Sequence, residues 1–227
     1  MKIDGLTGNI QGIIFDMDGL LVNSESLYWQ ANIKAAEESG IEIPHDSYLT
    51  LTGSDAETMD QFYRRYFPTK KSRDYFIKRT DELVWKWTDQ GKLRLKKGVQ
   101  HALDDFQAHD VKMAIASSNY RSVVEHVLWT TGTRQYFSFF LSWDDIQEKH
   151  LATKPAPDIY LWAAQKLQLP KEKLIVFEDS STGITAAYQA SIKSVMVPDL
   201  KPPTQIDYDH AALIVSDFDC FLEYLKE

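Results

Sequence analysis

The stretch "IIFDMDGLLVNSES", residues 13–26, decides the fold because its character changes in the middle. It opens with apolar residues, which is typical of a strand buried in a parallel sheet. The apolar run leads into two carboxylates, Asp16 and Asp18, and then into Gly19, which permits a tight turn. Ligands of an open parallel sheet bind beyond the carboxyl ends of its strands. The stretch therefore predicts a sheet edge at which two acids are available for chemistry.

Further apolar segments alternate with helical patterns along the chain. Short runs rich in Ile and Val, bounded by polar residues or glycine, predict buried parallel strands. They lie at residues 11–16, 111–117, 174–178 and 194–197, with a further strand expected at 137–142. Helical patterns lie at residues 98–109, 120–131, 157–168 and 182–191; Ser118 or Asn119 is expected to cap the second of these, and Gly132 to end it. Strand alternating with helix predicts an α/β protein with a Rossmann-like parallel sheet.

Residues 24–92 break this alternation, because they show no strand pattern. Their periodicity predicts three helices: from about 26 to 39, ending at Gly40; from about 55 to before Pro68; and from a cap at Ser72 toward Gly91. We expect residues 1–22 and 95–227 to form a discontinuous α/β catalytic core and residues 23–94 to form an all-helical cap. The aromatic residues expected in the core of that cap are Phe62, Tyr63, Tyr66, Phe67, Trp85 and Trp87.

The composition excludes several functions. The chain has 227 residues, a formal net charge of −8 and one cysteine, Cys220. Sequence-independent nucleic-acid binding needs clustered Lys and Arg, and a single cysteine provides neither an internal disulfide nor a zinc thiolate cluster. Moreover, no segment approaches the roughly 20 apolar residues that span a bilayer. We therefore expect a cytoplasmic monomer that binds neither nucleic acid nor membrane.

Polar groups from four distant parts of the chain follow predicted strands or lead into a predicted helix. In addition to Asp16 and Asp18, they are Ser117 and Ser118, Lys154, and Glu178 and Asp179. Because the carboxyl ends of parallel strands meet at one edge, we expect these groups to lie together. A single acid after a strand is often only a turn or cap residue. Four such groups at one edge predict a catalytic site.

The chemistry of such a group follows from its residue types. Carboxylates brought together repel one another unless a hard cation neutralises them, and oxygen-only ligation suits Mg²⁺. Asp16 and Asp179 are the expected ligands. A carboxylate beside Mg²⁺ can attack phosphorus, while Asp18 protonates the leaving oxygen and later activates water. Ser117 and Lys154, with nearby backbone N–H groups, can hold the phosphoryl oxygens.

Four segments of this sequence carry a family resemblance. They are "DMDGLLVNSE" at 16–25, "ASSN" at 116–119, "KPAPDIY" at 154–160 and "EDSSTGITAA" at 178–187. In order and spacing they resemble the four motifs of the haloacid dehalogenase superfamily, and the helical insert resembles its β-phosphoglucomutase-like branch. The resemblance implies that Asp16 is the nucleophile, Asp18 the general acid and base, and Ser117 and Lys154 the phosphate-holding groups. It also implies that the Asp18 carbonyl, Asp179 and the adjacent Glu178 belong to the Mg²⁺ site.

The chain departs from this pattern at two positions. Thr153 stands where relatives have glycine before the lysine, so the loop that carries Lys154 is expected to differ in length or shape. Ser191 stands where relatives have glycine after a helix, which costs about 1 kcal/mol if its φ is positive. The second departure affects stability rather than chemistry.

Rival activities share parts of this pattern. A dehalogenase needs no proton donor for a halide, so Asp18 argues for phosphate chemistry. A phospho-acceptor switch also uses an aspartate at a strand end, but Asp18 would promote hydrolysis of its acyl phosphate. We therefore expect a Mg²⁺-dependent phosphatase that acts on small phosphomonoesters, such as sugar phosphates, through an aspartyl-phosphate.

The nearest alternative is a β-phosphoglucomutase-type phosphomutase. Its relatives use a histidine and an arginine of the cap to hold a second phosphate, and the corresponding residues here are Tyr28 and Ala56. Neither supplies a positive charge. Arg64, Arg65 or Lys86 could compensate, although at helical spacing they are more typical of a solvated surface. Specificity is expected to reside in the cap, at Gly53, Ser54 and Tyr28.

Overall fold

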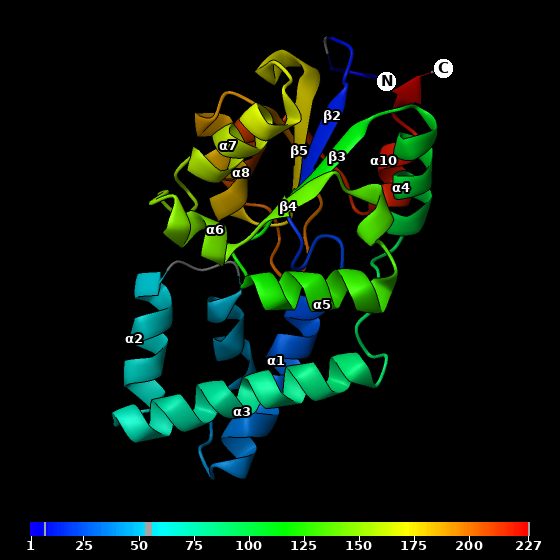
Figure 1. Ribbon diagram of the computed structural model, residues 1–227. Helices are drawn as coiled ribbons and strands as arrows, with labels where there is room; N and C mark the ends of the chain where they lie inside the picture. The colour runs from blue at the N-terminus through cyan, green and yellow to red at the C-terminus, as the bar shows by residue number, and fades with distance from the viewer. Residues whose placement is uncertain (7, 53–55, 227) are drawn as a thin grey trace.

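A six-stranded parallel sheet forms the centre of the protein. The computed structural model describes residues 1–6, 8–52 and 56–226. The strand order is β4-β3-β2-β5-β6-β7, of which Figure 1 labels β4, β3, β2 and β5. The strands are β2 (Gly12–Phe15), β3 (Lys112–Ala116), β4 (Phe139–Leu141), β5 (Leu174–Glu178), β6 (Lys193–Met196) and β7 (Leu213–Ile214). The predicted α/β fold with a parallel sheet is confirmed, including the strand expected near residues 137–142.

The register of the central strands aligns their carboxyl ends. Phe15 at the end of β2 lies opposite Ile115 of β3 and Phe177 of β5. The next residues along the three strands are therefore neighbours at one edge of the sheet. Since β2 lies between β3 and β5, Asp16 is placed near the middle of that edge.

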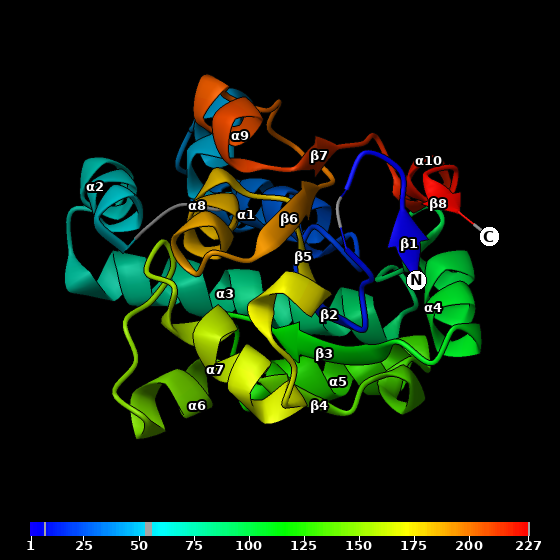
Figure 2. The ribbon, with the colours of Figure 1, turned by 90° about the horizontal axis from the view of Figure 1, so that it is seen from above.

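Helices cover both faces of the sheet, so its strands are buried on both sides. Ile13 and Phe15 pack in one cluster with Phe106 of α4 (Val99–Ala108), whereas Ile14 belongs to a second cluster on the opposite face. α5 (Arg121–Thr131) and α10 (Phe218–Leu222) also contribute to the first cluster, and α7 (Asp158–Leu167) and α8 (Ser181–Gln189) to the second. Successive side chains of a strand point to opposite faces, so a sheet covered on both faces needs apolar residues at consecutive positions. Figure 2 shows the helices on either side of the strands.

The elements that the structure describes between β2 and α4 are helices, as expected. They are α1 (Ser24–Glu38), the 3₁₀ helix η1 (His45–Leu51), α2 (Ala56–Tyr66) and α3 (Lys70–Asp89). These helices lie beyond the carboxyl edge of the sheet (Figure 1) and share a cluster of buried side chains. The cluster includes Tyr48, Phe62, Phe67, Phe76 and Leu83.

Two chain connections join this helical segment to the rest of the molecule, and they run side by side. Val22 and Leu95 form an isolated antiparallel bridge. The Asn23 N–H donates to the Arg94 carbonyl at 3.1 Å, and the Arg94 N–H donates to the Asn23 side chain at 2.7 Å. A division of the chain at 22/23 and 94/95 stays a prediction, and these paired connections would be its natural hinge.

Several local expectations differ from the structure. Thr69, not Ser72, is the N-cap of α3, and Ser72 completes the capping box three residues later. α5 begins after Tyr120 rather than after Ser118 or Asn119. Trp85 is 44% exposed on α3 and is not part of the buried cap cluster, although the other aromatic residues expected there contribute to it or pack against it.

Short elements were not expected from the sequence. They are β1 (Lys2–Ile3), β8 (Leu225–Lys226), β7, α6 (Trp143–Glu148), α9 (Gln205–His210), α10 and the 3₁₀ helices η2 (Arg134–Tyr136) and η3 (Lys171–Lys173). β1 and β8 pair antiparallel, which brings the two ends of the chain together (Figure 2). Within the described ranges, no helix combines the length and apolar character needed to cross a bilayer.

Candidate active site

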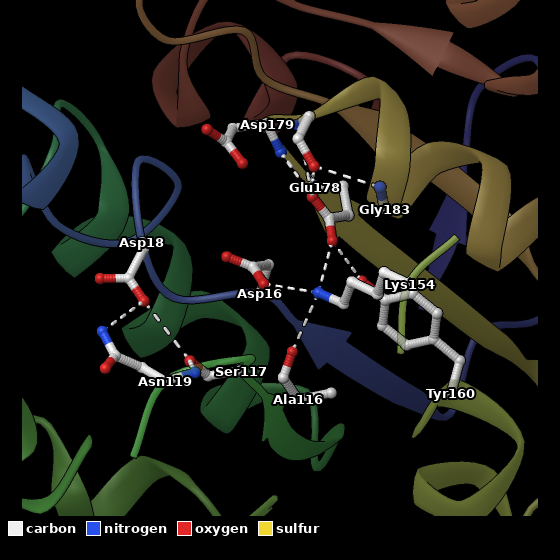
Figure 3. A network of polar contacts seen from close by, with 11 residues as sticks. Asp16, Asp18, Ala116, Ser117, Asn119, Lys154, Tyr160, Glu178, Asp179 and Gly183 are labelled. Atoms are coloured by element: carbon white, nitrogen blue, oxygen red, sulfur yellow. Dashed lines mark hydrogen bonds and ion pairs between the residues drawn. The ribbon is translucent and has the colours of Figure 1, made fainter. Parts of the chain in front are cut away.

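The sheet edge brings together the polar groups that the sequence placed after its strands (Figure 3). Asp16 follows β2, Ser117 follows β3 and Glu178 ends β5. Lys154 comes from the loop before α7 and reaches the same edge. The predicted juxtaposition therefore exists, whereas the chemical role of each residue stays a prediction.

Lys154 is the positive centre of this group. Its Nζ lies 2.6 Å from Asp16 Oδ1 and 2.7 Å from Glu178 Oε1, and it donates to the Ala116 carbonyl at 3.2 Å. The Lys154 side chain is only 8% exposed. Coulombic attraction to Asp16 and Glu178 outweighs burial and holds the pKa of Lys154 well above its usual value. Thr153, in place of glycine, does not keep the amine from the site.

Glu178 is held by donors on both of its oxygens. Besides Lys154, the Tyr160 hydroxyl donates to Oε1 at 2.5 Å. Oε2 accepts from the Asp179 N–H at 3.1 Å, the Ser180 N–H at 3.3 Å and the Ser180 hydroxyl at 3.0 Å. The residue is fully buried, so these bonds replace the solvation that the carboxylate loses. Tyr160 was not singled out from the sequence, although it closes the "KPAPDIY" segment.

Three carboxylates converge at this edge. Asp16, Glu178 and Asp179 each place an oxygen within 4.8 Å of the other two. Burial, chiefly, raises the pKa values of Asp16 and Asp179, and the charge of Glu178 adds to both effects. Lys154 opposes this rise at Asp16 but leaves the cluster with more negative than positive charge. An all-oxygen set with excess negative charge fits a hard divalent cation such as Mg²⁺.

The three carboxylates differ in how many hydrogen bonds they already accept. Among the described residues, no hydrogen bond reaches the Asp179 carboxylate, and only Lys154 donates to that of Asp16. The Glu178 oxygens already accept five hydrogen bonds. Asp16 and Asp179 are therefore the side chains that best fit direct contact with a cation, and Glu178 fits a place beside it.

Asp18 lies next to this cluster on the turn after β2. Ser117 Oγ and Asn119 Nδ2 each donate to Asp18 Oδ2 at 3.4 Å. Burial raises the pKa of Asp18, while hydrogen bonds from Ser24, Asn119 and Ser117 lower it. Gly19 makes the turn with φ +71°, and a Cβ there would stand 2.3 Å from an Asp179 oxygen. Gly19 therefore satisfies both the backbone conformation and the close approach of Asp179.

Two serines follow β3, and they differ in position. Ser117 is fully buried, and its Oγ accepts from the Asn119 N–H at 3.0 Å while it points toward Asp18. Ser118 lies in the wall of the adjacent cavity together with Asn119. Ser118 therefore presents its polar groups to the cavity, and Ser117 braces the Asp18 carboxylate.

A cavity of about 420 Å³ opens between the sheet edge and the helical segment. Asp16, Asp18, Lys154 and Asp179 line its end at the sheet edge. Tyr28 of α1 also lines it, and its role in specificity stays a prediction. The other two residues expected to govern specificity, Gly53 and Ser54, lie outside the described residues.

The cavity wall also contains residues of the helical segment that were not predicted from the sequence. Among them are Asn32, Thr80 and Asp81, which come from α1 and α3. Asn32 and Thr80 are buried, and Thr80 Oγ1 donates to Asn32 Oδ1 at 3.1 Å. A polar residue on an otherwise packed helix face is a weak signal by itself, because its partner lies 48 positions away in the sequence.

Glu25 of α1 is a further acidic residue in the wall of this cavity. Burial, chiefly, raises its pKa to about 8, and the charges of Asp18 and Asp199 add to the effect. Asp199 itself pairs with Lys96 at 2.7 Å. Nearby, Lys201 donates to the Thr52 carbonyl at 2.5 Å, which connects a core loop to the helical segment.

Comparisons with known proteins agree with this geometry. The family model for haloacid dehalogenase-like hydrolases matches residues 13–197. A phosphorylated carbohydrates phosphatase of Thermotoga maritima is 30% identical over 186 residues, covering 82% of this chain and 84% of that protein. Hexitol phosphatase B of Escherichia coli is 29% identical over 191 residues, covering 83% and 84%.

A solved structure shows the same fold along nearly the whole chain. It is that of a candidate β-phosphoglucomutase from Thermotoga maritima, with 27% identity and a TM-score of 0.76, and the match covers 94% of this chain and 98% of that one. The four motifs, the parallel sheet and the matched family model lead to one conclusion. The chain belongs to the haloacid dehalogenase-like hydrolases, as its motifs indicated.

Proposed function

We propose that this protein is a Mg²⁺-dependent phosphatase that hydrolyses small phosphomonoesters through an aspartyl-phosphate. The observation that carries the proposal is the pairing of Asp16 with Lys154 at 2.6 Å inside a buried acidic cluster that opens onto a cavity. The two phosphatase names among the relatives support the reaction type and a phosphorylated carbohydrate as substrate.

Each residue at the edge then has a distinct task. Mg²⁺, held by Asp16, Asp179 and the Asp18 carbonyl with Glu178 beside it, would neutralise the phosphoryl oxygens and bring them close to the nucleophile. Lys154 and Ser118 hold phosphoryl oxygens, and Ser117 braces Asp18. Residues 23–94 act as a cap that excludes water and contacts the organic part of the substrate.

The reaction proceeds in two transfers. A carboxylate oxygen of Asp16 attacks phosphorus, the bond from phosphorus to the ester oxygen breaks, and Asp18 gives its proton to the departing alcohol. Asp18 then takes a proton from water as that water attacks phosphorus, which releases inorganic phosphate and restores the Asp16 carboxylate. The raised pKa of Asp18 suits its first task, because it favours the protonated form.

The cavity favours hydrolysis over the phosphomutase alternative. A mutase must hold a second phosphate, and Lys154 is the only cationic side chain among the described residues of the cavity wall. Arg64 pairs with Asp60 on the exposed face of α2, Arg65 lies over the Tyr66 ring, and Lys86 is outside this cavity. The expected cationic substitutes are therefore directed elsewhere.

Phosphate release from a panel of phosphomonoesters tests the proposal. Wild-type protein should release phosphate with Mg²⁺, lose activity in excess chelator and regain it when Mg²⁺ is restored. Asp16→Asn should lower kcat by several orders of magnitude while the protein still unfolds in one cooperative urea transition, because the amide is nearly isosteric but not nucleophilic.

Three results would contradict this assignment. Full activity in excess chelator would show that the reaction needs no Mg²⁺. If Asp16→Asn kept more than a tenth of wild-type kcat, Asp16 would not be the nucleophile. Conversion of β-glucose 1-phosphate to glucose 6-phosphate, with catalytic glucose 1,6-bisphosphate, at ten times the rate of phosphate release would establish the mutase.

A further inference from the structure

The cap side of the cavity presents polar groups that are not used by the protein itself. Tyr28 and Tyr63 line it, and no hydrogen bond from a described residue reaches either hydroxyl. Asn32 uses its Oδ1 to accept from Thr80, while its amide nitrogen has no hydrogen-bond partner among the described residues. Burial raises the pKa of Tyr63 to about 12. These phenols therefore stay protonated at neutral pH and can donate to substrate oxygens.

Asp81 is the charged member of this wall. It lies one residue after Thr80 on α3, and no hydrogen bond or ion pair connects its carboxylate to a described residue. Its charge acts on both Tyr28 and Tyr63, which places it beside the two phenols. Burial raises the pKa of Asp81, although its side chain also reaches solvent.

Acidic side chains outnumber cationic ones among the described residues of the cavity wall. Five acids line the cavity among its described residues, namely Asp16, Asp18, Glu25, Asp81 and Asp179. Lys154 is their only cationic counterpart there, and it is already bound by Asp16 and Glu178. Lys201, which does not line the cavity, donates to the Thr52 carbonyl. The cap half therefore offers no positive charge for a second anionic group.

Apolar side chains complete the cap half. Trp29, Met59, Phe76 and Ile77 lie in the wall among the polar groups. A surface of this kind, with separate donors and acceptors between apolar contacts, suits a carbon chain that carries hydroxyl groups. The volume of about 420 Å³ is near the lower end of the range for small-molecule sites, about 300–1,000 Å³.

We propose that the cavity selects phosphomonoesters whose organic part is a neutral polyhydroxylated chain, and that Asp81 rejects substrates with a second anionic group. Tyr28, Tyr63 and Asn32 bind the hydroxyls. The inference rests on the proposed phosphatase activity, because the phosphate must occupy the Asp16 end of the cavity. It goes further by assigning substrate class and specificity to cap residues.

A matched pair of substrates tests the selection. Glucitol 6-phosphate and 6-phosphogluconate have the same carbon chain, but a hydroxymethyl group of the first is a carboxylate in the second. With Mg²⁺, wild-type kcat/KM should favour glucitol 6-phosphate by about tenfold or more, since like charges repel across a partly desolvated cavity. A ratio near one, or one that favours 6-phosphogluconate, would overturn the proposal.

Two substitutions on α3 distinguish a specific effect of Asp81 from a general effect of net charge. Asp81→Asn should reduce the preference at least threefold, mainly through a lower KM for 6-phosphogluconate. Asp74→Asn is the control, because Asp74 pairs with Lys70 on the exposed side of α3 and does not line this cavity. An equal effect of both variants, or no effect of Asp81→Asn, would overturn the assignment to Asp81.

Binding to a non-turnover background keeps this test independent of the reaction. Dissociation constants of the two ligands for Asp16→Asn, with and without Asp81→Asn, are measured by calorimetry. The same preference and the same reduction are expected there. Absence of turnover in wild type combined with this binding preference would refute the phosphatase and leave the specificity intact, whereas equal binding of both ligands would refute the specificity alone.

Discussion

At the scale of single residues, the Tyr160 hydroxyl is the contact that connects α7 to the buried carboxylates. It donates to Glu178 Oε1, the same oxygen that Lys154 approaches, and the Lys154 amine also lies 4.9 Å from the centre of the Tyr160 ring. Tyr160 and Glu178 are both fully buried. Water is therefore poorly placed to replace the hydroxyl if it is removed.

Tyr160→Phe is expected to lower the free energy of unfolding by about 1.5–3 kcal/mol, the range for a hydrogen bond to a charged group. Urea denaturation measures this change. Tyr188→Phe is the matched control, since Tyr188 is 55% exposed and its ring stacks on His210. The control should change stability by less than about 0.5 kcal/mol. Equal stability of Tyr160→Phe and wild type would show that the hydroxyl contributes nothing to holding Glu178.

At the scale of elements, the ends of α5 and α8 use the same backbone turn with different residues. Gly132 after α5 has φ +67°, and Ser191 after α8 has φ +58°. At α8 the Ser191 N–H donates to the Tyr188 carbonyl at 2.9 Å and the Ile192 N–H to that of Ala187 at 3.1 Å. This pattern ends a helix in the left-handed conformation, which glycine adopts with least strain.

Ser191→Gly is therefore expected to raise the free energy of unfolding by up to about 1 kcal/mol, and Gly132→Ser to lower it by about the same amount. Thermal and urea unfolding of both variants test the pair. A side chain at Gly132 would meet no atom within 4 Å, so that change reports backbone conformation alone. A loss of stability in Ser191→Gly would show that the serine side chain matters more than its φ.

Elements of sufficient length were predictable because their periodicity reflects how they are buried. The β2 and β5 segments read as continuous apolar runs since both of their faces pack against helices. β1 and β7 have two residues each, which is too few to show any period. At α3, Thr69 and Ser72 are both good cap residues, and only the observed reciprocal bonds decide which is the N-cap.

Residues of the candidate site also differ in how far the sequence predicts their positions. Those at the sheet edge were predictable, because a parallel sheet brings the residues after its strands to one edge. The contacts of Tyr160 with Glu178 and of Asn32 with Thr80 depend on how helices pack, and sequence spacing does not encode that. The cap wall, including Asp81, therefore emerged only from the arrangement of α1 and α3.

At the scale of the whole molecule, the cavity exists because the helical segment stands over the sheet edge (Figure 1). Lys201, in the loop after β6, donates to the Thr52 carbonyl of the helical segment at 2.5 Å. Burial lowers the pKa of Lys201, while the charges of Glu25 and Asp179 raise it. The contact thus joins the two sides of the cavity close to the acids.

Lys201→Met is expected to raise KM for a good phosphomonoester about tenfold with a smaller change in kcat, because the alkyl stem is kept while the cross-connection is lost. Steady-state kinetics at saturating Mg²⁺ measures the split. Lys97→Met is the control. The Lys97 side chain is 69% exposed, and its partner Asp217 lies outside the helical segment, so this pair does not connect the two sides of the cavity. The stability of Lys201→Met should stay within about 0.5 kcal/mol of wild type. An unchanged KM in Lys201→Met would mean that closure over the substrate does not depend on this contact, and a KM raised equally by both variants would point to net charge instead.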